Sequence, residues 1–195
     1  MNYLAHLHLS QPNGESRFGN LLGDFMHGVQ PHIYSQTIQA GLANHRLVDK
    51  FTDQHAQVIQ AKQLFSARRR RFAGIIVDVS FDHFLIKHWS QFSDLPFARF
   101  EQSVYQQLEG LLAKMPDSMQ AMIGSMVSHR WLDTYASLSG VGRALDNTAA
   151  RIRFKHQFDN SIEEVQHHYA ALEAHFLQFY PELQAHVRAH RLELG

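Results

Sequence analysis

The stretch that decides the fold is Gly74-Ile-Ile-Val-Asp-Val-Ser-Phe-Asp-His-Phe-Leu-Ile-Lys-His-Trp89. A helix built from these residues is apolar on nearly every side, so it is expected to be buried. Asp78 and Asp82 nonetheless lie four residues apart on one face of it, with His83 beside them. A buried carboxylate is costly unless a partner compensates it, and two together repel. The pair therefore predicts a strongly positive partner, either a divalent metal or, as the alternative, an arginine.

The composition is that of one globular domain, 1–195. A chain of 195 residues with 45% hydrophobic residues is long enough for a substantial core and is not disordered. The formal net charge of +0 gives no bias toward nucleic acid or membrane as a partner. The absence of cysteine excludes disulfides and thiol catalysis and fits a cytoplasmic protein. No signal-peptide pattern and no apolar run of about 20 residues is present, so no membrane span is expected.

Helical periodicity runs through almost the whole chain, and no segment has the alternation of a strand. We therefore predict an all-α, single-domain bundle of about seven to nine helices. Ser161–Glu164 reads as a capping box that opens a last long helix reaching Tyr180, and Pro181 is expected to start a terminal turn or helix. The other expected helices cover 16–26, 36–64, 74–91, 96–114 and 117–135, with short helices in 143–156.

A second polar row lies on the long helix expected at 36–64. His45 and Asp49 are four residues apart, so they share one helix face about 6 Å from each other and can bind one ion. Asp53 extends the same row. The alternative is a core histidine bonded to its own helix neighbour. Arg46 points elsewhere on this helix, where it can hold a phosphate oxygen or pair with an acid.

Two further segments place acidic or imidazole groups in apolar surroundings. Asp24 stands between Gly23 and Phe25, and it reads either as a metal ligand or as a helix cap or arginine partner. His6 and His8 are two residues apart, so they cannot share one helix face. At most one of them is expected to reach a common site, with His6 favoured because the pattern makes it less exposed.

These rows, on separate core helices, can converge in the interior of a bundle. Oxygen-rich ligation with one or two imidazoles favours Mn²⁺, Mg²⁺ or Fe²⁺ over structural zinc. Such an ion lowers the pKa of a bound water and neutralises phosphate oxygens. Asp78 or His83 would then orient or deprotonate that water. The residues thus predict metal-dependent hydrolysis.

Eight short motifs are spread along nearly the whole chain: Asn2–Ser10, Gly19–Phe25, His45–Asp49, Thr52–Asp53, Asp82–Leu85, Trp89, Tyr169–Glu173 and Gln178–Pro181. Taken together, they resemble the acyl carrier protein phosphodiesterase family, also called acyl carrier protein hydrolases. The resemblance continues to the end of the chain and covers nearly all of it.

The resemblance implies an all-helical fold distantly similar to the HD phosphohydrolases. It implies hydrolysis of the phosphodiester that joins 4′-phosphopantetheine to a serine of holo acyl carrier protein, with Mn²⁺ as the favoured metal. In this sequence the adjacent pair Asp82-His83 stands in the reverse of the usual His-Asp order, so ligands cannot be copied from the wider superfamily. The candidate metal ligands are Asp24, His45, Asp49 and Asp82, and the candidate catalytic residues are His83, Asp78 and Arg46.

An acidic carrier protein also calls for a basic docking patch. Arg68–Arg71, with Lys62 nearby, can supply it, and the alternative is a solvated charge run. If these arginines dock the partner, reversing several of them is expected to raise KM far more than it changes kcat. Two other functions stay open from the residues: a phosphohydrolase of a nucleotide or other small phosphate ester, and a non-catalytic helical module stiffened by metal.

Overall fold

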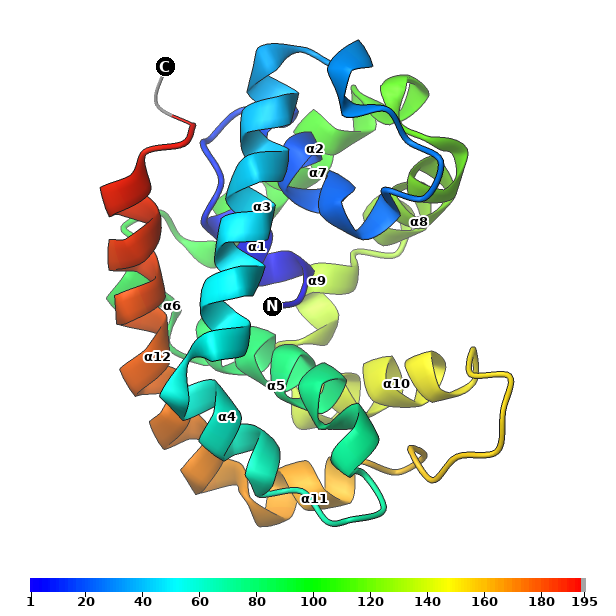
Figure 1. The fold of residues 1–195 in the computed structure, drawn as a ribbon, viewed down its shortest axis with the longest axis vertical. Coiled ribbons are helices and arrows are strands. Elements are labelled where there is room, and N and C mark those ends of the chain that lie inside the picture. The colour runs from blue at the N-terminus through cyan, green and yellow to red at the C-terminus, as the bar shows by residue number, and fades with distance from the viewer. Residues whose placement is uncertain (194–195) are drawn as a thin grey trace.

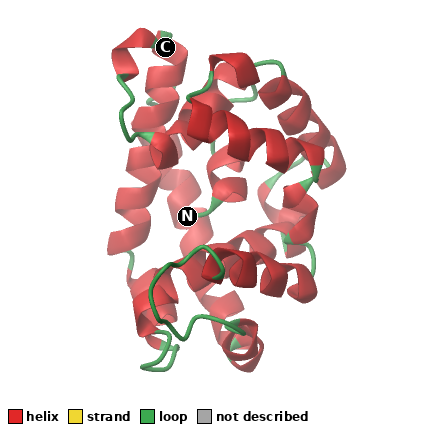
Figure 2. Ribbon diagram, turned by 90° about the vertical axis from the view of Figure 1, so that its right-hand side faces the viewer, coloured by secondary structure: helices red, strands yellow, loops and turns green. Residues whose placement is uncertain are grey.

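The structure is a computed structural model that describes residues 1–193, and within them the chain is helical without any strand (Figure 2). The prediction of an all-α fold is confirmed. The predicted number of helices is too low, because twelve α-helices and four short 3₁₀ helices form in this range. The α-helices are α1 (Tyr3–His8), α2 (Gly14–Leu22), α3 (Gln36–Gln54), α4 (Ala56–Gln63), α5 (Ala73–Lys87), α6 (Trp89–Phe92), α7 (Phe97–Glu109), α8 (Asp117–Ser128), α9 (Trp131–Thr134), α10 (Leu138–Ala149), α11 (Ile162–His167) and α12 (Tyr169–His190). The 3₁₀ helices are η1 (Gly23–Phe25), η2 (Pro31–Ile33), η3 (Arg70–Phe72) and η4 (Leu112–Lys114).

Several helices expected to be continuous are broken at a single residue. The helix expected at 36–64 ends at Gln54 because His55 is extended, with φ −75° and ψ 131°. The His55 side chain then caps α4, with Nδ1 accepting from the N–H of Gln57 at 3.2 Å. The helix expected at 117–135 breaks at Arg130, which is left-handed with φ 49°. No proline or glycine stands next to either break, so neither break has the usual sequence signal.

The C-terminal predictions need three corrections. The long helix expected to open at Ser161 and reach Tyr180 is divided at His168 into α11 and α12, and α12 runs on to His190. Pro181 starts no new element but lies exposed inside the continuous helix α12. The opposite face of α12 is fully buried through Phe179 and Tyr180, and this packing outweighs the lost backbone hydrogen bond. The capping box does not form either: the Ser161 hydroxyl donates to the carbonyl of Phe158, and Glu164 accepts from Ser66.

Helix α5 is the buried helix that the opening stretch predicted. Val77, Phe81, Phe84 and Leu85 are fully buried in it. Helices α1, α4, α10 and α12 all pack against α5, and α12 also runs beside α3 and α4 along one side of the molecule (Figure 1). No helix in residues 1–193 combines the length and the hydropathy needed to cross a bilayer.

Two glycines let α2 and α3 cross in close contact. A Cβ on Gly19 would lie 2.2 Å from the carbonyl oxygen of Ile38, and one on Gly41 would lie 2.6 Å from that of Ser16. Helix α1 contacts both α2 and α5, and the N-terminus lies near the middle of the molecule in both views (Figures 1 and 2). The fold therefore brings α1, α3 and the end of α2 together.

Candidate metal centre

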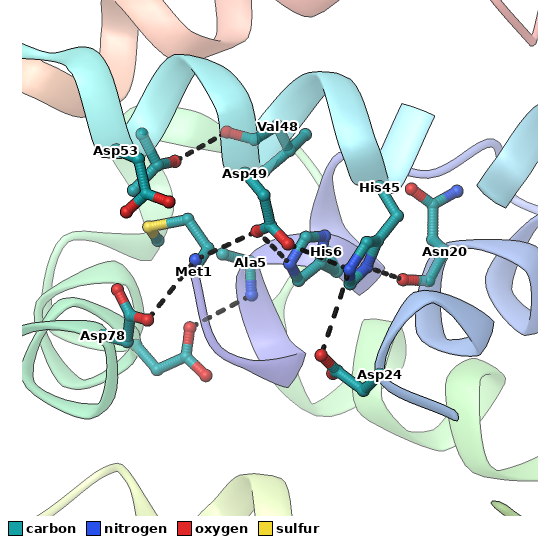
Figure 3. Close-up of polar contacts among 12 residues, drawn as sticks. Met1, Ala5, His6, Asn20, Asp24, His45, Val48, Asp49, Asp53 and Asp78 are labelled. Carbon is teal, nitrogen blue, oxygen red and sulfur yellow. Dashed lines mark hydrogen bonds and ion pairs between the residues drawn. The ribbon is translucent and has the colours of Figure 1, made fainter. Parts of the chain in front are cut away.

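Three side chains from two helices converge where α1 meets α3 (Figure 3). His6 of α1 and His45 and Asp49 of α3 each offer one ligand atom, and these atoms lie within 4.8 Å of one another. His45 Nε2 is 3.0 Å from Asp49 Oδ2, and His6 Nε2 is 3.2 Å from Asp49 Oδ1. Two imidazoles and a carboxylate at this spacing form a group that can hold a metal ion.

The orientation of His45 is set by the close crossing of α2 and α3. Its Nδ1 lies 2.7 Å from the carbonyl oxygen of Asn20 and donates to it, so Nε2 is left to face Asp49. The His6 and His45 rings stack with centroids 4.1 Å apart and an interplanar angle of 16°. A backbone carbonyl that holds the second nitrogen of a histidine is a common support for a metal ligand.

The pKa values of His6, His45 and Asp49, the three side chains of this cluster, are shifted in different directions. Burial lowers the pKa of His6 to about 4, although Asp49 opposes the shift. Burial also acts to lower the pKa of His45, but Asp49 and Asp24 outweigh it, and the net pKa is raised. Burial would raise the pKa of Asp49, yet His45 and His6 hold it well below its usual range. Asp49 is thus held in its anionic form, and His45 keeps its proton to a higher pH than an ordinary histidine does.

The surroundings of His6 indicate whether these residues fit a cation. Its side chain is 1% exposed, and neither ring nitrogen has a partner in hydrogen-bonding geometry. The 3.2 Å approach of His6 Nε2 to Asp49 is thus a close contact between a neutral imidazole and a carboxylate that is not aligned as a hydrogen bond. A buried polar group without a partner is costly, and a metal ion at Nε2 would relieve that cost. The residues present therefore fit a metal.

Asp24, predicted as a ligand, stands at the edge of this cluster on η1. Its Oδ1 lies 3.9 Å from His45 Nε2, and 44% of its side chain is exposed. Partial burial raises the pKa of Asp24, and His45 opposes the shift. Asp24, His45 and Asp49 are thus brought together, as the sequence indicated, with Asp24 nearest to solvent.

Asp82, the fourth predicted ligand, has other partners. Its two oxygens accept from the N–H groups of Leu4 and Ala5, at 3.0 and 3.1 Å, at the start of α1. Asp78, one turn earlier, places Oδ2 3.5 Å from the Met1 amine, which lies 3.3 Å from Asp49 Oδ1. The positive partner that this carboxylate pair required is therefore the amino-terminal end of α1, with its amine and free amides.

His83 and Arg46, predicted to be catalytic, have no hydrogen bond or ion pair with the residues of the cluster. His83 Nδ1 donates to the carbonyl of Tyr135 at 2.8 Å, and Nε2 is 2.9 Å from the hydroxyl of Tyr169, so both nitrogens are occupied. Arg46 is exposed and makes no ion pair or hydrogen bond with any described residue. His8 also turns away, with Nδ1 2.6 Å from the Tyr180 hydroxyl.

Sequence reasoning favoured His6 over His8 but did not include it among the ligands. The sequence signal that could have identified His6 as a ligand is its place in an apolar run, in which His6 and His8 must face different sides of the helix. The roles of Asn20 and of the start of α1 had no signal at all, since a backbone carbonyl and backbone amides carry no side-chain pattern. Asp53, expected to extend the row, instead pairs with Lys62 at 3.0 Å.

Comparison with known proteins gives matches over almost the whole chain. Residues 1–183 match the family model described as acyl carrier protein phosphodiesterase. A protein of that name from Enterobacter sp. (strain 638) is 35% identical over 98% of this chain and 100% of its own length. The proteins of that name from Serratia proteamaculans (strain 568), covering the same shares, and from Escherichia coli O157:H7, covering 95% of this chain and 96% of its own, are 37% and 36% identical. No solved structure matches, so the expected likeness to HD phosphohydrolases stays a prediction. A match of this length and identity shows that the chain belongs to the acyl carrier protein phosphodiesterase family.

Proposed function

We propose that this protein hydrolyses the phosphodiester between 4′-phosphopantetheine and a serine of holo acyl carrier protein. The products would be apo carrier protein and free 4′-phosphopantetheine. The observation that carries the proposal is the convergence of His6, His45 and Asp49, with ligand atoms within 4.8 Å, in a chain of this family.

The proposed ligands are His6, His45 and Asp49. Asp24, predicted as a ligand, lies at the open edge of the cluster and is proposed as its acid–base group instead. A divalent ion bound there would supply charge to phosphoryl oxygens and lower the pKa of a water molecule. Mn²⁺ is the proposed ion, because a mixed set of imidazoles and carboxylates suits it, and Mg²⁺ and Fe²⁺ are the alternatives. Asp82 is proposed to act indirectly, by anchoring the start of α1 and with it His6.

Proton transfer falls to the acids beside the cluster. Asp24 is exposed to incoming substrate and its pKa is raised, so it can accept a proton from the attacking water or return one to the serine oxygen that leaves. Asp78 shares the Met1 amine with Asp49 and is proposed to tune that carboxylate. For His83 we propose a structural role in place of the predicted catalytic one, because both of its nitrogens have partners in the core. Arg46 remains a candidate for holding substrate charge from the surface.

Holo acyl carrier protein is the proposed substrate and partner, and a cytoplasmic location stays a prediction. The test is mass-detected loss of phosphopantetheine from holo carrier protein, with and without Mn²⁺, alongside calorimetric Mn²⁺ binding. His45→Ala and Asp49→Ala are expected to lose turnover and Mn²⁺ binding while keeping the helical signal. His190→Ala, an exposed histidine at the end of α12, is the matched control and should behave as wild type.

Each other outcome has a definite meaning. Turnover of nucleotides without turnover of holo carrier protein would support a small-phosphate phosphohydrolase instead. Stoichiometric Mn²⁺ with no turnover of any phosphodiester would support the non-catalytic, metal-stiffened module. Full turnover by His45→Ala would overturn the ligand assignment itself.

A further inference from the structure

A cavity of about 630 Å³ opens beside the start of α1. It is walled by α5, α8, α9 and α10, together with the residues that precede and begin α1. Its volume falls in the range of roughly 300–1,000 Å³ that is typical of small-molecule sites. None of the proposed metal ligands lines it, so it is a separate chamber from the cluster.

The cavity and the cluster are nevertheless neighbours through two helices. Tyr3 lines the cavity and lies one helical turn before His6 on α1, and residues at that spacing are adjacent. On α5, Val79 lines the cavity and directly follows Asp78. Burial raises the pKa of Tyr3 to about 12, and the charges of Asp24 and Arg151 act on it in opposite directions. Tyr3 therefore joins the cavity to the helix that carries His6.

The lining is mixed in the way that a long amphipathic ligand requires. Trp131 and Tyr135 on α9 and its C-terminal flank, together with Val79, supply apolar surface. Asn2 and Asn147 supply amide groups that can donate and accept hydrogen bonds. The Asn2 amide nitrogen is buried and has no hydrogen-bond partner among the described residues. An incoming carbonyl would satisfy it.

The pantetheine part of the substrate has this same mixture of groups. It carries a branched apolar unit, a hydroxyl, two amides and a terminal thiol, and it begins at the phosphodiester that is cut. We propose that the cavity holds the pantetheine arm, with its phosphate end toward Tyr3 and the cluster and its amides toward Asn2 and Asn147. This inference rests on the proposed function.

Two exposed arginines, Arg143 and Arg151, complete the cavity wall. Neither makes an ion pair with a described residue. Arg151 lines the cavity together with Tyr3, and its charge acts to lower the pKa of that tyrosine. Positive charge at this place favours the anionic phosphoryl group over a neutral chain end, which orients the arm.

Asn147→Trp tests the proposal, because Asn147 is exposed on α10 and a large ring there fills the cavity without disturbing the core. Pantetheine, which lacks phosphate, is the binding probe, followed by calorimetry or by NMR of the protein. Wild type is expected to bind it, and Asn147→Trp to lose at least tenfold in affinity. KM for holo carrier protein should rise by a similar factor.

Gln102→Trp places the same ring on an exposed position of α7 outside the cavity and should match wild type in every assay. Equal pantetheine binding by wild type and Asn147→Trp, or no binding by either, would overturn the cavity assignment even if holo carrier protein is cleaved. Pantetheine binding that depends on Asn147, in a protein that never cleaves holo carrier protein, would instead overturn the proposed function and leave the site standing.

Discussion

At the scale of single residues, His6 and His45 differ in what their surroundings do to the proton. Burial lowers the pKa of His6 to about 4, so this ring is already neutral near pH 7 and ready to bind a metal. The net pKa of His45 is raised against burial by Asp49 and Asp24. A metal ion needs both imidazoles neutral, so it must displace the proton of His45.

Mn²⁺ affinity is therefore expected to rise with pH through the raised pKa of His45. Below that pKa, each decrease of one pH unit should weaken Mn²⁺ binding about tenfold, because one proton leaves His45 for each ion bound. Calorimetry in buffers with different ionisation enthalpies measures this proton release directly. Proton release near zero at pH 6 would contradict the proposed state of His45.

Asp82 is a buried carboxylate with a structural duty, and its removal should show in stability. Asp82→Ala leaves the amides of Leu4 and Ala5 without their acceptor, which is expected to cost about 1–3 kcal/mol of unfolding free energy. Asp82→Asn keeps one acceptor oxygen and should cost less. Urea unfolding monitored by circular dichroism gives both values. An Asp82→Ala protein as stable as wild type would remove the anchoring role.

The pH dependence of Asp82 has a definite sign. Burial raises its pKa from 3.8 to about 7, so between these values the folded state holds a proton that the unfolded state has lost. Its contribution to stability is full below about pH 4 and is lost as pH rises through about 7. Asp82→Asn, which does not titrate, should flatten this part of the stability profile.

At the scale of elements, the contact between η1 and α3 holds the cluster in place. A Cβ on Gly23 would lie 2.0 Å from Cδ2 and 2.2 Å from Nε2 of His45. No other side chain fits there while His45 keeps its hydrogen bond to Asn20. Gly23 is thus needed because the His45 ring occupies the space that any larger side chain would take.

Gly23→Ala is expected to turn the His45 ring and lower Mn²⁺ affinity at least tenfold, with a smaller effect on unfolding. The matched control is Gly124→Ala on α8, where a Cβ meets nothing within 4 Å. There the substitution should stabilise the protein by about 0.5–1 kcal/mol and leave Mn²⁺ binding alone. Wild-type Mn²⁺ affinity in Gly23→Ala would contradict the packing argument.

At the scale of the whole molecule, the run Arg68–Arg71 divides into two kinds of residue. Arg69 is buried and pairs with Glu164 at 3.0 Å, which ties the segment before α5 to α11. Arg68, Arg70 and Arg71 are exposed, and the Arg71 guanidinium lies 4.5 Å from the Phe154 ring. Arg70 donates to the carbonyl oxygen of Phe65 at 3.3 Å. Arg68 and Arg71 are therefore the arginines most available to a partner, whereas Arg69 belongs to the fold.

Reversal of the exposed charges, in an Arg68→Glu, Arg71→Glu double variant, is expected to raise KM for holo carrier protein several-fold with little change in kcat. Added salt should shrink the difference, because surface charges are screened. Arg188→Glu, an exposed position on α12, serves as the control. Unchanged KM at low salt would exclude a docking role for Arg68 and Arg71.

The helical class, the burial of α5 and the pairing of His45 with Asp49 were all predictable, because each depends on side chains that repeat at helical spacing. Helix ends were less predictable. His55 and Arg130 break helices through their backbone conformation, and Pro181 is tolerated inside α12 because the packing of its neighbours outweighs a lost hydrogen bond.

For the candidate site, the sequence by itself determined that carboxylates and imidazoles share the faces of core helices and need positive partners. Only the tertiary structure decided which partner each one meets. Asp82 meets the amides of α1, and His45 and Asp49 meet His6. The reason is physical: spacing along a helix determines which side chains share a face, but the neighbour across that face comes from a distant segment whose backbone amides and carbonyls carry no pattern.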